Sequence, residues 1–167
     1  MMGSTALLCA PMSPGLKDAT RLHRLYDNFC VPIEPKFHHG GVSVPDLAAS
    51  IRWYRDVLGF EVEYRFEIPK ARATVAMIRR GALRMELFQV QAGQPLPEER
   101  RVPDLDLQTH GNKHVCFGVQ SVDEAERELR AKGVDIVFVG RVMHPPNIFM
   151  RDNSGNLIEF IEQPDLW

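Results

Sequence analysis

An internal repeat constrains the fold of this chain more than any other feature. From residue 37 onward the sequence contains two units of one pattern, each a strand, a helix and three further strand-like runs. His39 and His114 lie in the first runs, 75 residues apart, and Gly59 and Gly133 follow the helices, 74 residues apart. Landmarks that recur at a near-constant offset indicate a duplicated supersecondary unit. The sequence therefore predicts two tandem βαβββ modules.

Each unit contains one helix with start and stop signals. In "PDLAASIRWYRDVLGF", Asp46 is placed to cap the helix and Gly59 to end it. In "SVDEAERELRAKGV", the cap is Ser121 or Asp123 and the stop is Gly133. We therefore predict one amphipathic helix directly after the first strand of each module.

The remaining runs alternate apolar and polar residues or are rich in β-branched and aromatic residues, as strands are. The predicted strands are 38–44, 60–68, 71–80 and 82–90 in the first unit, and 113–119, 134–140, 147–152 and 156–163 in the second. This pattern predicts an α+β fold.

The repeat also sets the expected domain organisation. A single domain spans 37–164, with module one at 37–90 and module two at 113–164. The connector, 91–112, is polar and Pro-rich and reads either as a lid or as a simple linker. Residues 1–36 form an N-terminal extension in which 16–29 is predicted to be a helix, and we do not expect a signal peptide there.

Composition limits the function classes. The 167 residues are 44% hydrophobic and 25% charged with a net charge of −2, as in ordinary soluble domains. This balance favours neither nucleic-acid nor membrane partners. The odd number of cysteines, three, argues against a disulfide scaffold, so we expect a cytoplasmic protein.

Four residues that can bind metals stand at equivalent places in the two units. His39 opens the first strand of module one and Glu86 lies in its last, 47 residues later. His114 and Glu159 repeat this arrangement with a spacing of 45 residues. Packing alone does not explain such a repetition. Two imidazoles and two carboxylates would suit one divalent ion such as Ni²⁺, Co²⁺, Zn²⁺, Mn²⁺ or Fe²⁺.

Strand alternation places these residues on one side. In "ALRMELF", Leu83, Met85 and Leu87 share the apolar face, which leaves Glu86 on the opposite, concave face. Glu159 has apolar neighbours on its own face, where a carboxylate is costly unless it is paired or bound to a metal.

The two adjacent histidines, His38 and His39, have separate roles in this scheme. Alternation places His39 on the face of Gly41, in register with His114, and turns His38 to the other face, where we expect a structural or exposed side chain.

Other side chains qualify as pocket residues. Arg84 shares the face of Glu86 and is a candidate anion contact, and Cys116 is predicted to line the pocket beside His114. His110 and His144 lie in loops near the expected mouth of the pocket.

Several segments together resemble the vicinal oxygen chelate superfamily of glyoxalases, bleomycin-resistance proteins and extradiol dioxygenases. They are "HHGGVSVPDLAASIRWYRDVLGFEVE", "RMELF", "KHVCFGVQSVDEAERELRAKGV" and "FMRDNSGNLIEFIE", and the resemblance covers 37 to about 164. It implies two modules that form a cupped mixed sheet around one divalent metal. The implied metal ligands are His39, Glu86, His114 and Glu159.

The resemblance also suggests an activity, and the sequence looks most like the methylmalonyl-CoA epimerase and glyoxalase I members. It implies a small-molecule substrate that chelates the metal through adjacent oxygens, and an isomerase or lyase that moves a proton next to a carbonyl through a metal-stabilised enediolate. Glu86 and Glu159 are the expected catalytic residues. The alternatives are an Fe(II)-dependent extradiol-type dioxygenase and a non-catalytic small-molecule binding or resistance protein. We expect a homodimer, as is common in the superfamily.

Overall fold

The structure is a computed structural model that describes residues 33–142 and 145–166. The predicted helix over 16–29 and the candidate His144 therefore lie outside the described residues. By its contacts the chain divides into two units, Met1–Phe37 and His38–Trp167, and the second contains both predicted modules.

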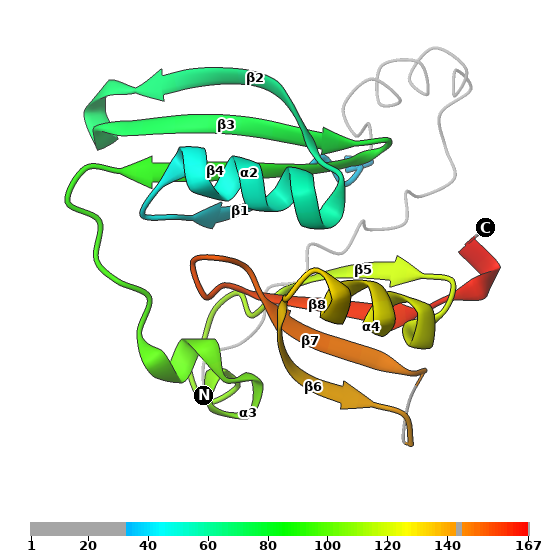
Figure 1. Cartoon of the computed structure of the whole chain (residues 1–167). Coiled ribbons are helices and arrows are strands. Elements are labelled where there is room, and N and C mark those ends of the chain that lie inside the picture. The colour runs from blue at the N-terminus through cyan, green and yellow to red at the C-terminus, as the bar shows by residue number, and fades with distance from the viewer. Residues whose placement is uncertain (1–32, 143–144, 167) are drawn as a thin grey trace, which may run out of the picture. The chain divides into compact units, whose positions relative to one another are not determined.

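The elements follow the predicted order in each module (Figure 1). Module one consists of β1 (Gly40–Ser43), α2 (Leu47–Leu58), β2 (Glu61–Ile68), the 3-10 turn η1 (Pro69–Ala71), β3 (Ala73–Arg80) and β4 (Leu83–Val90). Module two consists of β5 (Val115–Val119), α4 (Val122–Ala131), β6 (Asp135–Gly140), β7 (Asn147–Arg151), β8 (Leu157–Glu162) and the 3-10 turn η3 (Pro164–Leu166).

The strands form two four-stranded mixed sheets of the same topology. Their orders are β1-β4-β3-β2 and β5-β8-β7-β6. In each sheet the first strand pairs parallel with the last, and the other pairs are antiparallel. Even the irregularities are repeated, with a register shift between Val62 and Tyr64 in β2 and between Ile136 and Phe138 in β6. The predicted α+β fold with duplicated βαβββ modules is confirmed.

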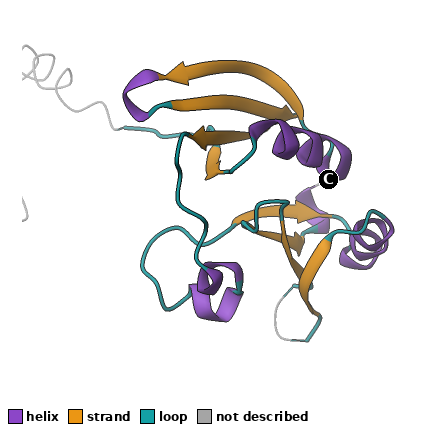
Figure 2. Ribbon diagram, turned by 60° about the vertical axis from the view of Figure 1, so that its left-hand side comes forward, coloured by secondary structure: helices purple, strands orange, loops and turns teal. Residues whose placement is uncertain are grey.

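The two helices lie on the same side of the two sheets and share one core (Figures 1 and 2). Apolar side chains from α2, α4 and the helix-facing sides of both sheets form a single buried cluster, which includes Leu47, Tyr54, Leu58, Ala76, Ile78, Met85, Leu87, Val122, Leu129, Ile148, Met150 and Ile158. Because this face of each sheet is used by the core, the other face is left for polar and functional side chains.

Both helices begin at the predicted caps. The Asp46 carboxylate accepts a hydrogen bond from the Ala49 amide at 2.9 Å, and the Ser121 hydroxyl accepts one from Glu124 at 3.3 Å. Of the two possible caps for the second helix, the structure selects Ser121. Each cap satisfies an amide that the first helical turn leaves without a partner.

A second device at the helix starts is also duplicated. The Leu47 amide of α2 donates to Oε1 of Gln89 at 2.7 Å, and the Val122 amide of α4 donates to Oε2 of Glu162 at 2.9 Å. Gln89 and Glu162 lie near the ends of β4 and β8. The last strand of each module therefore fixes the start of that module's own helix.

The residues that end the helices allow a prediction about stability. Gly59 and Gly133 both have φ of 69°, a left-handed conformation in which a side chain is strained. We expect Gly59→Ala and Gly133→Ala each to lower the free energy of unfolding by about 1 kcal/mol, as measured by urea denaturation. An unchanged urea midpoint in either variant would contradict this account of the helix ends.

The connector contains more structure than the predicted loop. It forms a 3-10 turn, η2 (Glu98–Arg101), and a short helix, α3 (Pro103–Asp106). Asp106 is buried, with its carboxylate against the guanidinium of Arg100 and 3.8 Å from the ammonium of Lys113. A buried ion pair between residues close in the chain is not visible in polar, Pro-rich composition, which is why the sequence indicated only a loop.

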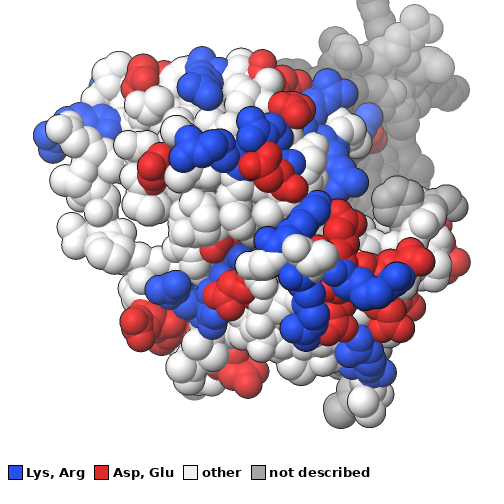
Figure 3. Space-filling model, viewed as in Figure 1, with Lys and Arg blue, Asp and Glu red and all other residues white. Residues whose placement is uncertain are grey.

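Charges of both signs are mixed on the face of the molecule that carries the helices (Figure 3). On α4, Arg130 pairs with Glu126 at 2.7 Å and Lys132 with Glu128 at 2.6 Å, one turn apart in each case. No helix in the described part of the chain is long and apolar enough to cross a membrane.

Candidate functional site

The two candidate histidines stand directly before the first strands of their modules. β1 begins at Gly40 and β5 at Val115, so both strands are shorter at the start than predicted. The two strands approach each other where they begin, because a Cβ at Gly40 would be 3.4 Å from Cγ2 of Val115. His39 and His114, each one residue before this contact, therefore enter the same central region of the molecule.

Strand register defines the sheet face opposite the helices, which we call the open face. On it, neighbouring residues across module one are Gly41, Glu86, Met77 and Tyr64. Across module two they are Cys116, Glu159, Phe149 and Phe138. Both glutamates lie on this face, because Met85 and Ile158, the residues before them, belong to the core.

The four candidate ligands form two His–Glu pairs. Nε2 of His39 lies 3.2 Å from Oε2 of Glu86, and Nε2 of His114 lies 3.0 Å from Oε2 of Glu159. The side chains of Glu86 and Glu159 are only 14% and 13% exposed. Each carboxylate is therefore largely shielded from solvent, with a histidine nitrogen as a close polar neighbour. Among residues 33–142 and 145–166, no three His, Cys, Asp or Glu side chains converge as a metal-holding group. The described structure thus has two pairs where the sequence indicated one four-residue cluster.

His38 has a role that the sequence did not indicate. Its Nδ1 lies 2.7 Å from Nδ1 of His39, and the two rings meet edge to face. One of these nitrogens donates a hydrogen and the other accepts it. If His39 donates, its Nε2 keeps a free lone pair toward Glu86, which is the form that binds a metal.

The two glutamates differ in how firmly they are held. Oε1 of Glu159 accepts a hydrogen bond from the Asn147 amide at 2.8 Å, while its other oxygen faces His114.

Burial and the neighbouring Glu159 carboxylate raise the pKa of the Cys116 thiol to about 12, so this cysteine is protonated at neutral pH. By strand register Cys116 lies beside Glu159 on the open face.

Of the other predicted pocket residues, the structure describes Arg84 and His110. Arg84 donates two hydrogen bonds to Glu63, at 2.8 and 2.9 Å, and this contact lowers the pKa of the Glu63 carboxyl. The charge of Arg84 is therefore already neutralised by a residue of β2. His110 is exposed in the connector.

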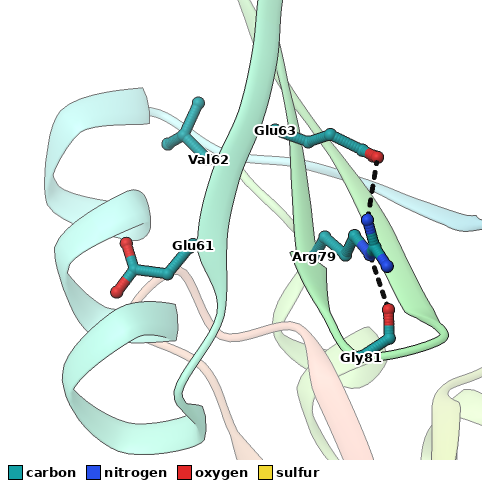
Figure 4. Close-up of a pocket in the computed structure, with 5 residues that line it drawn as sticks. All are labelled: Glu61, Val62, Glu63, Arg79 and Gly81. Atoms are coloured by element: carbon teal, nitrogen blue, oxygen red, sulfur yellow. Dashed lines mark hydrogen bonds and ion pairs between the residues drawn. The ribbon is translucent and has the colours of Figure 1, made fainter.

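A surface pocket lies where β2 begins and β3 ends, beside the turn between β3 and β4, and not at the His–Glu pairs. It is lined by Glu61, Val62, Glu63, Arg79 and Gly81 (Figure 4). Arg79 points across it, 3.7 Å from Glu63, and donates to the Gly81 carbonyl at 2.6 Å. Because its one arginine is occupied in this way, the pocket offers no strong anchor for a charged ligand.

Two residues near the pairs were not predicted from the sequence. Asn147 reaches Glu159, and Phe149 packs edge to face on His114 with ring centroids 4.9 Å apart. Both follow from the pairing of β7 with β8, which sets which residues meet across strands. The sequence determines the alternation within a strand but does not reveal this cross-strand register.

Comparison with known proteins identifies the family to which this duplicated fold belongs. The family model described as "Glyoxalase/Bleomycin resistance protein/Dioxygenase superfamily" matches residues 36–160. The chain is 30% identical over 133 residues to the mitochondrial methylmalonyl-CoA epimerase of Mus musculus, covering 74% of this chain and 71% of the mouse protein.

Solved structures show the same fold. A glyoxalase family protein from Enterococcus faecalis matches with a TM-score of 0.64 at 20% identity, over 76% of this chain and 97% of that protein. A mutant fosfomycin resistance protein from Listeria monocytogenes, in complex with Mn(II), matches with a TM-score of 0.56 at 18% identity, over 77% and 90% of the two chains. With the family model matching most of its length, the chain belongs to the glyoxalase/bleomycin resistance protein/dioxygenase superfamily.

Proposed function

We propose that this protein is a divalent-metal-dependent isomerase or lyase that moves a proton at a carbon next to a carbonyl. The observation that carries the proposal is the pair of His–Glu contacts at equivalent positions of the two modules, both on the open face. The similarity to an epimerase and to a protein that binds Mn(II) supports the reaction class and the metal.

The donors fit a divalent ion that prefers nitrogen and oxygen ligands. In each pair a nitrogen and an oxygen are 3.0–3.2 Å apart, close to the separation of about 3.0 Å between neighbouring ligands that each lie about 2.1 Å from one ion. We propose that His39, Glu86, His114 and Glu159 together hold one such ion. When bound, it supplies Lewis-acid stabilisation of the negative charge that develops on the substrate's carbonyl oxygen.

The chain's own residues then transfer the proton. The Glu86 carboxylate is the better placed base, because its polar contact is with His39, whereas Glu159 is also held by Asn147. Glu86 takes the proton, the C–H electron pair forms a C=C bond, and the C=O π pair moves onto the carbonyl oxygen. A proton then returns to carbon either from Glu86, or from a Glu159 that entered the cycle protonated, in which case Glu86 afterwards releases its proton to solvent and Glu159 takes one up. Return from Glu86 would retain the configuration at that carbon, and return from Glu159 across the substrate would invert it.

We further propose that the substrate is a small molecule with adjacent oxygens. Two neighbouring oxygens suit a site built from two half-sites, because each half contributes one nitrogen and one oxygen.

We also propose that the protein acts as a cytoplasmic homodimer. Analytical ultracentrifugation of the full chain tests this, and a purely monomeric protein at micromolar concentration would contradict it.

Metal analysis combined with one substitution tests the proposed function. We expect the purified protein to retain about one Ni, Co, Zn or Mn ion per chain. It should catalyse exchange of an α-proton with solvent deuterium in a panel of 2-substituted acyl thioesters and 2-hydroxy carbonyl compounds, followed by NMR. Glu86→Gln should slow this exchange by about 10²- to 10⁴-fold, the usual contribution of a general base.

Glu67→Gln is the matched control, because Glu67 is an exposed glutamate on β2 whose carboxylate accepts a hydrogen bond from Thr74. It should leave the exchange rate unchanged. Full exchange activity in Glu86→Gln would contradict the assigned base. Oxygen uptake by the iron-loaded protein with a catechol would instead support the dioxygenase alternative.

A further inference from the structure

Aromatic side chains extend the open face of module two outward from the His114–Glu159 pair. Phe149 lies beside Glu159 in the sheet and packs edge to face on His114, with centroids 4.9 Å apart. Phe138, its neighbour on β6, lies 6.4 Å from Phe149 between ring centroids and is 52% exposed. A large apolar side chain left this open, two strands from a polar pair on the same face, marks a surface suited to a ligand.

Module one repeats this arrangement with different side chains. From Glu86 the open face runs through Met77, which is buried, to Tyr64 on the edge strand. Tyr64 and Phe66 pack with centroids 6.0 Å apart and are 48% and 36% exposed. In each module an exposed aromatic ring therefore lies on the edge strand of the open face, two strands from the glutamate of the His–Glu pair.

The arginines that strand register places on the open face already contact carboxylates. Arg84 and Arg79 both contact Glu63, and Arg151 contacts Asp135 at 2.9 Å. The Glu63 carboxylate is shared by two guanidinium groups, at 2.8 Å from Arg84 and 3.7 Å from Arg79. A ligand carboxylate placed over these strands would lose water and would have to compete with Glu63 or Asp135 for a cation, which is unfavourable.

We propose that the open face selects substrates whose chelating oxygens carry a flat apolar substituent, such as an aromatic ring, in preference to a substituent with a carboxylate. The apolar group lies over Phe138 and Phe149 while the oxygens reach the His–Glu pairs. This inference rests on the proposed function, because it takes the pairs as the place where the oxygens bind. It adds a substrate class that the reaction type alone does not specify.

Hydroxamates of different substituents test this selection, because each presents the same two adjacent oxygens to a metal. The test is to measure the binding of benzohydroxamate, acetohydroxamate and succinic monohydroxamate by calorimetry. It uses the full chain loaded with its divalent metal and the same protein after chelation. We expect benzohydroxamate to bind at least about tenfold more tightly than acetohydroxamate, from burial of the ring and its contact with two aromatic side chains. Succinic monohydroxamate should bind no more tightly than acetohydroxamate.

Two variants assign the effect to the aromatic surface. Phe138→Ala should bring the affinity for benzohydroxamate to within about threefold of that for acetohydroxamate and leave acetohydroxamate binding unchanged. Val62→Ala is the control, because Val62 lies on an edge strand but pairs with the core residue Ile78 on the helix side. It should preserve the tenfold preference.

The possible failures can be told apart. If acetohydroxamate binds only to the metal-loaded protein but benzohydroxamate binds no better, or the carboxylated ligand binds best, the selection is wrong and the proposed function stands. If benzohydroxamate binds equally with and without metal and acetohydroxamate does not bind, the proposed metal chemistry fails instead. If none of the three binds, both are overturned. A Phe138→Ala variant that changes the oligomeric state and not the ligand preference would assign this surface to a subunit contact and overturn the selection.

Discussion

Replacing His39 by alanine should abolish stoichiometric metal binding, whereas replacing its neighbour His38 should not. His39 presents Nε2 to Glu86 at 3.2 Å, while His38 contacts only the opposite nitrogen of the His39 ring. Loss of an outer-shell partner typically weakens a metal site by about 10- to 100-fold. We therefore expect His39→Ala to weaken metal binding by more than about 100-fold and His38→Ala by about tenfold, measured by competition with a fluorescent chelator.

A second pair of variants makes this result specific. His114→Ala should match His39→Ala, because the two residues hold equivalent places in the duplicated site. His38→Gln, whose side-chain amide can also accept a hydrogen bond, should restore part of the affinity lost in His38→Ala. Equal metal loss in His38→Ala and His39→Ala, or normal binding in His39→Ala, would contradict the assignment of His39 as the metal ligand that precedes β1.

The sequence was sufficient for the architecture because the same signals occur twice. Both helix caps, both glycine stops and the alternation in the strands of Glu86 and Glu159 are local patterns, and each copy supports the other. A strand's own alternation decides which face a residue occupies, so the placement of both glutamates away from the core followed without knowledge of the partner strand.

The parts that the sequence missed depend on contacts between distant segments. The contact of Asn147 with Glu159 depends on the pairing of β7 with β8. The contact of Glu63 with Arg84 forms at the register shift in β2. Strand alternation predicted that His38 and His39 point to opposite faces, but their side chains contact each other. Both residues precede β1, so the alternation of the strand does not apply to them. Such details need three-dimensional register, which neighbouring sequence does not encode.

The two modules are joined by a buried hydrogen bond that also escaped the sequence. The Tyr54 hydroxyl on α2 donates to Oδ2 of Asp152 at 3.2 Å, and both residues are buried. The turn "DNSG" therefore does more than connect β7 to β8. Its first residue ties module two to the helix of module one, 98 residues earlier in the chain.

Asp152→Ala should destabilise the protein more than either glycine substitution at the helix ends. The Asp152 carboxylate accepts hydrogen bonds from the amides of Ser154 and Asn156 at 2.8 and 2.9 Å, from the Asn156 side chain at 2.9 Å, and from Tyr54. Alanine removes all four and leaves one buried and three half-buried donors without this acceptor, so we expect a loss of about 3–5 kcal/mol in the free energy of unfolding. Tyr54→Phe removes one of the four and should cost about 1 kcal/mol.

A double-mutant cycle followed by urea denaturation separates the contact between modules from the turn itself. In the Asp152→Ala background, Tyr54→Phe should cost nothing further, because the hydroxyl has already lost its acceptor, so the two losses should fall short of additivity by about 1 kcal/mol. Asp152→Asn keeps the shape and one acceptor oxygen and should lie between the two single variants. Because the modules share one core, every variant should still unfold in a single transition. Additive losses would mean that the Tyr54–Asp152 contact contributes nothing to stability, and two separate transitions would mean that the modules fold independently of each other.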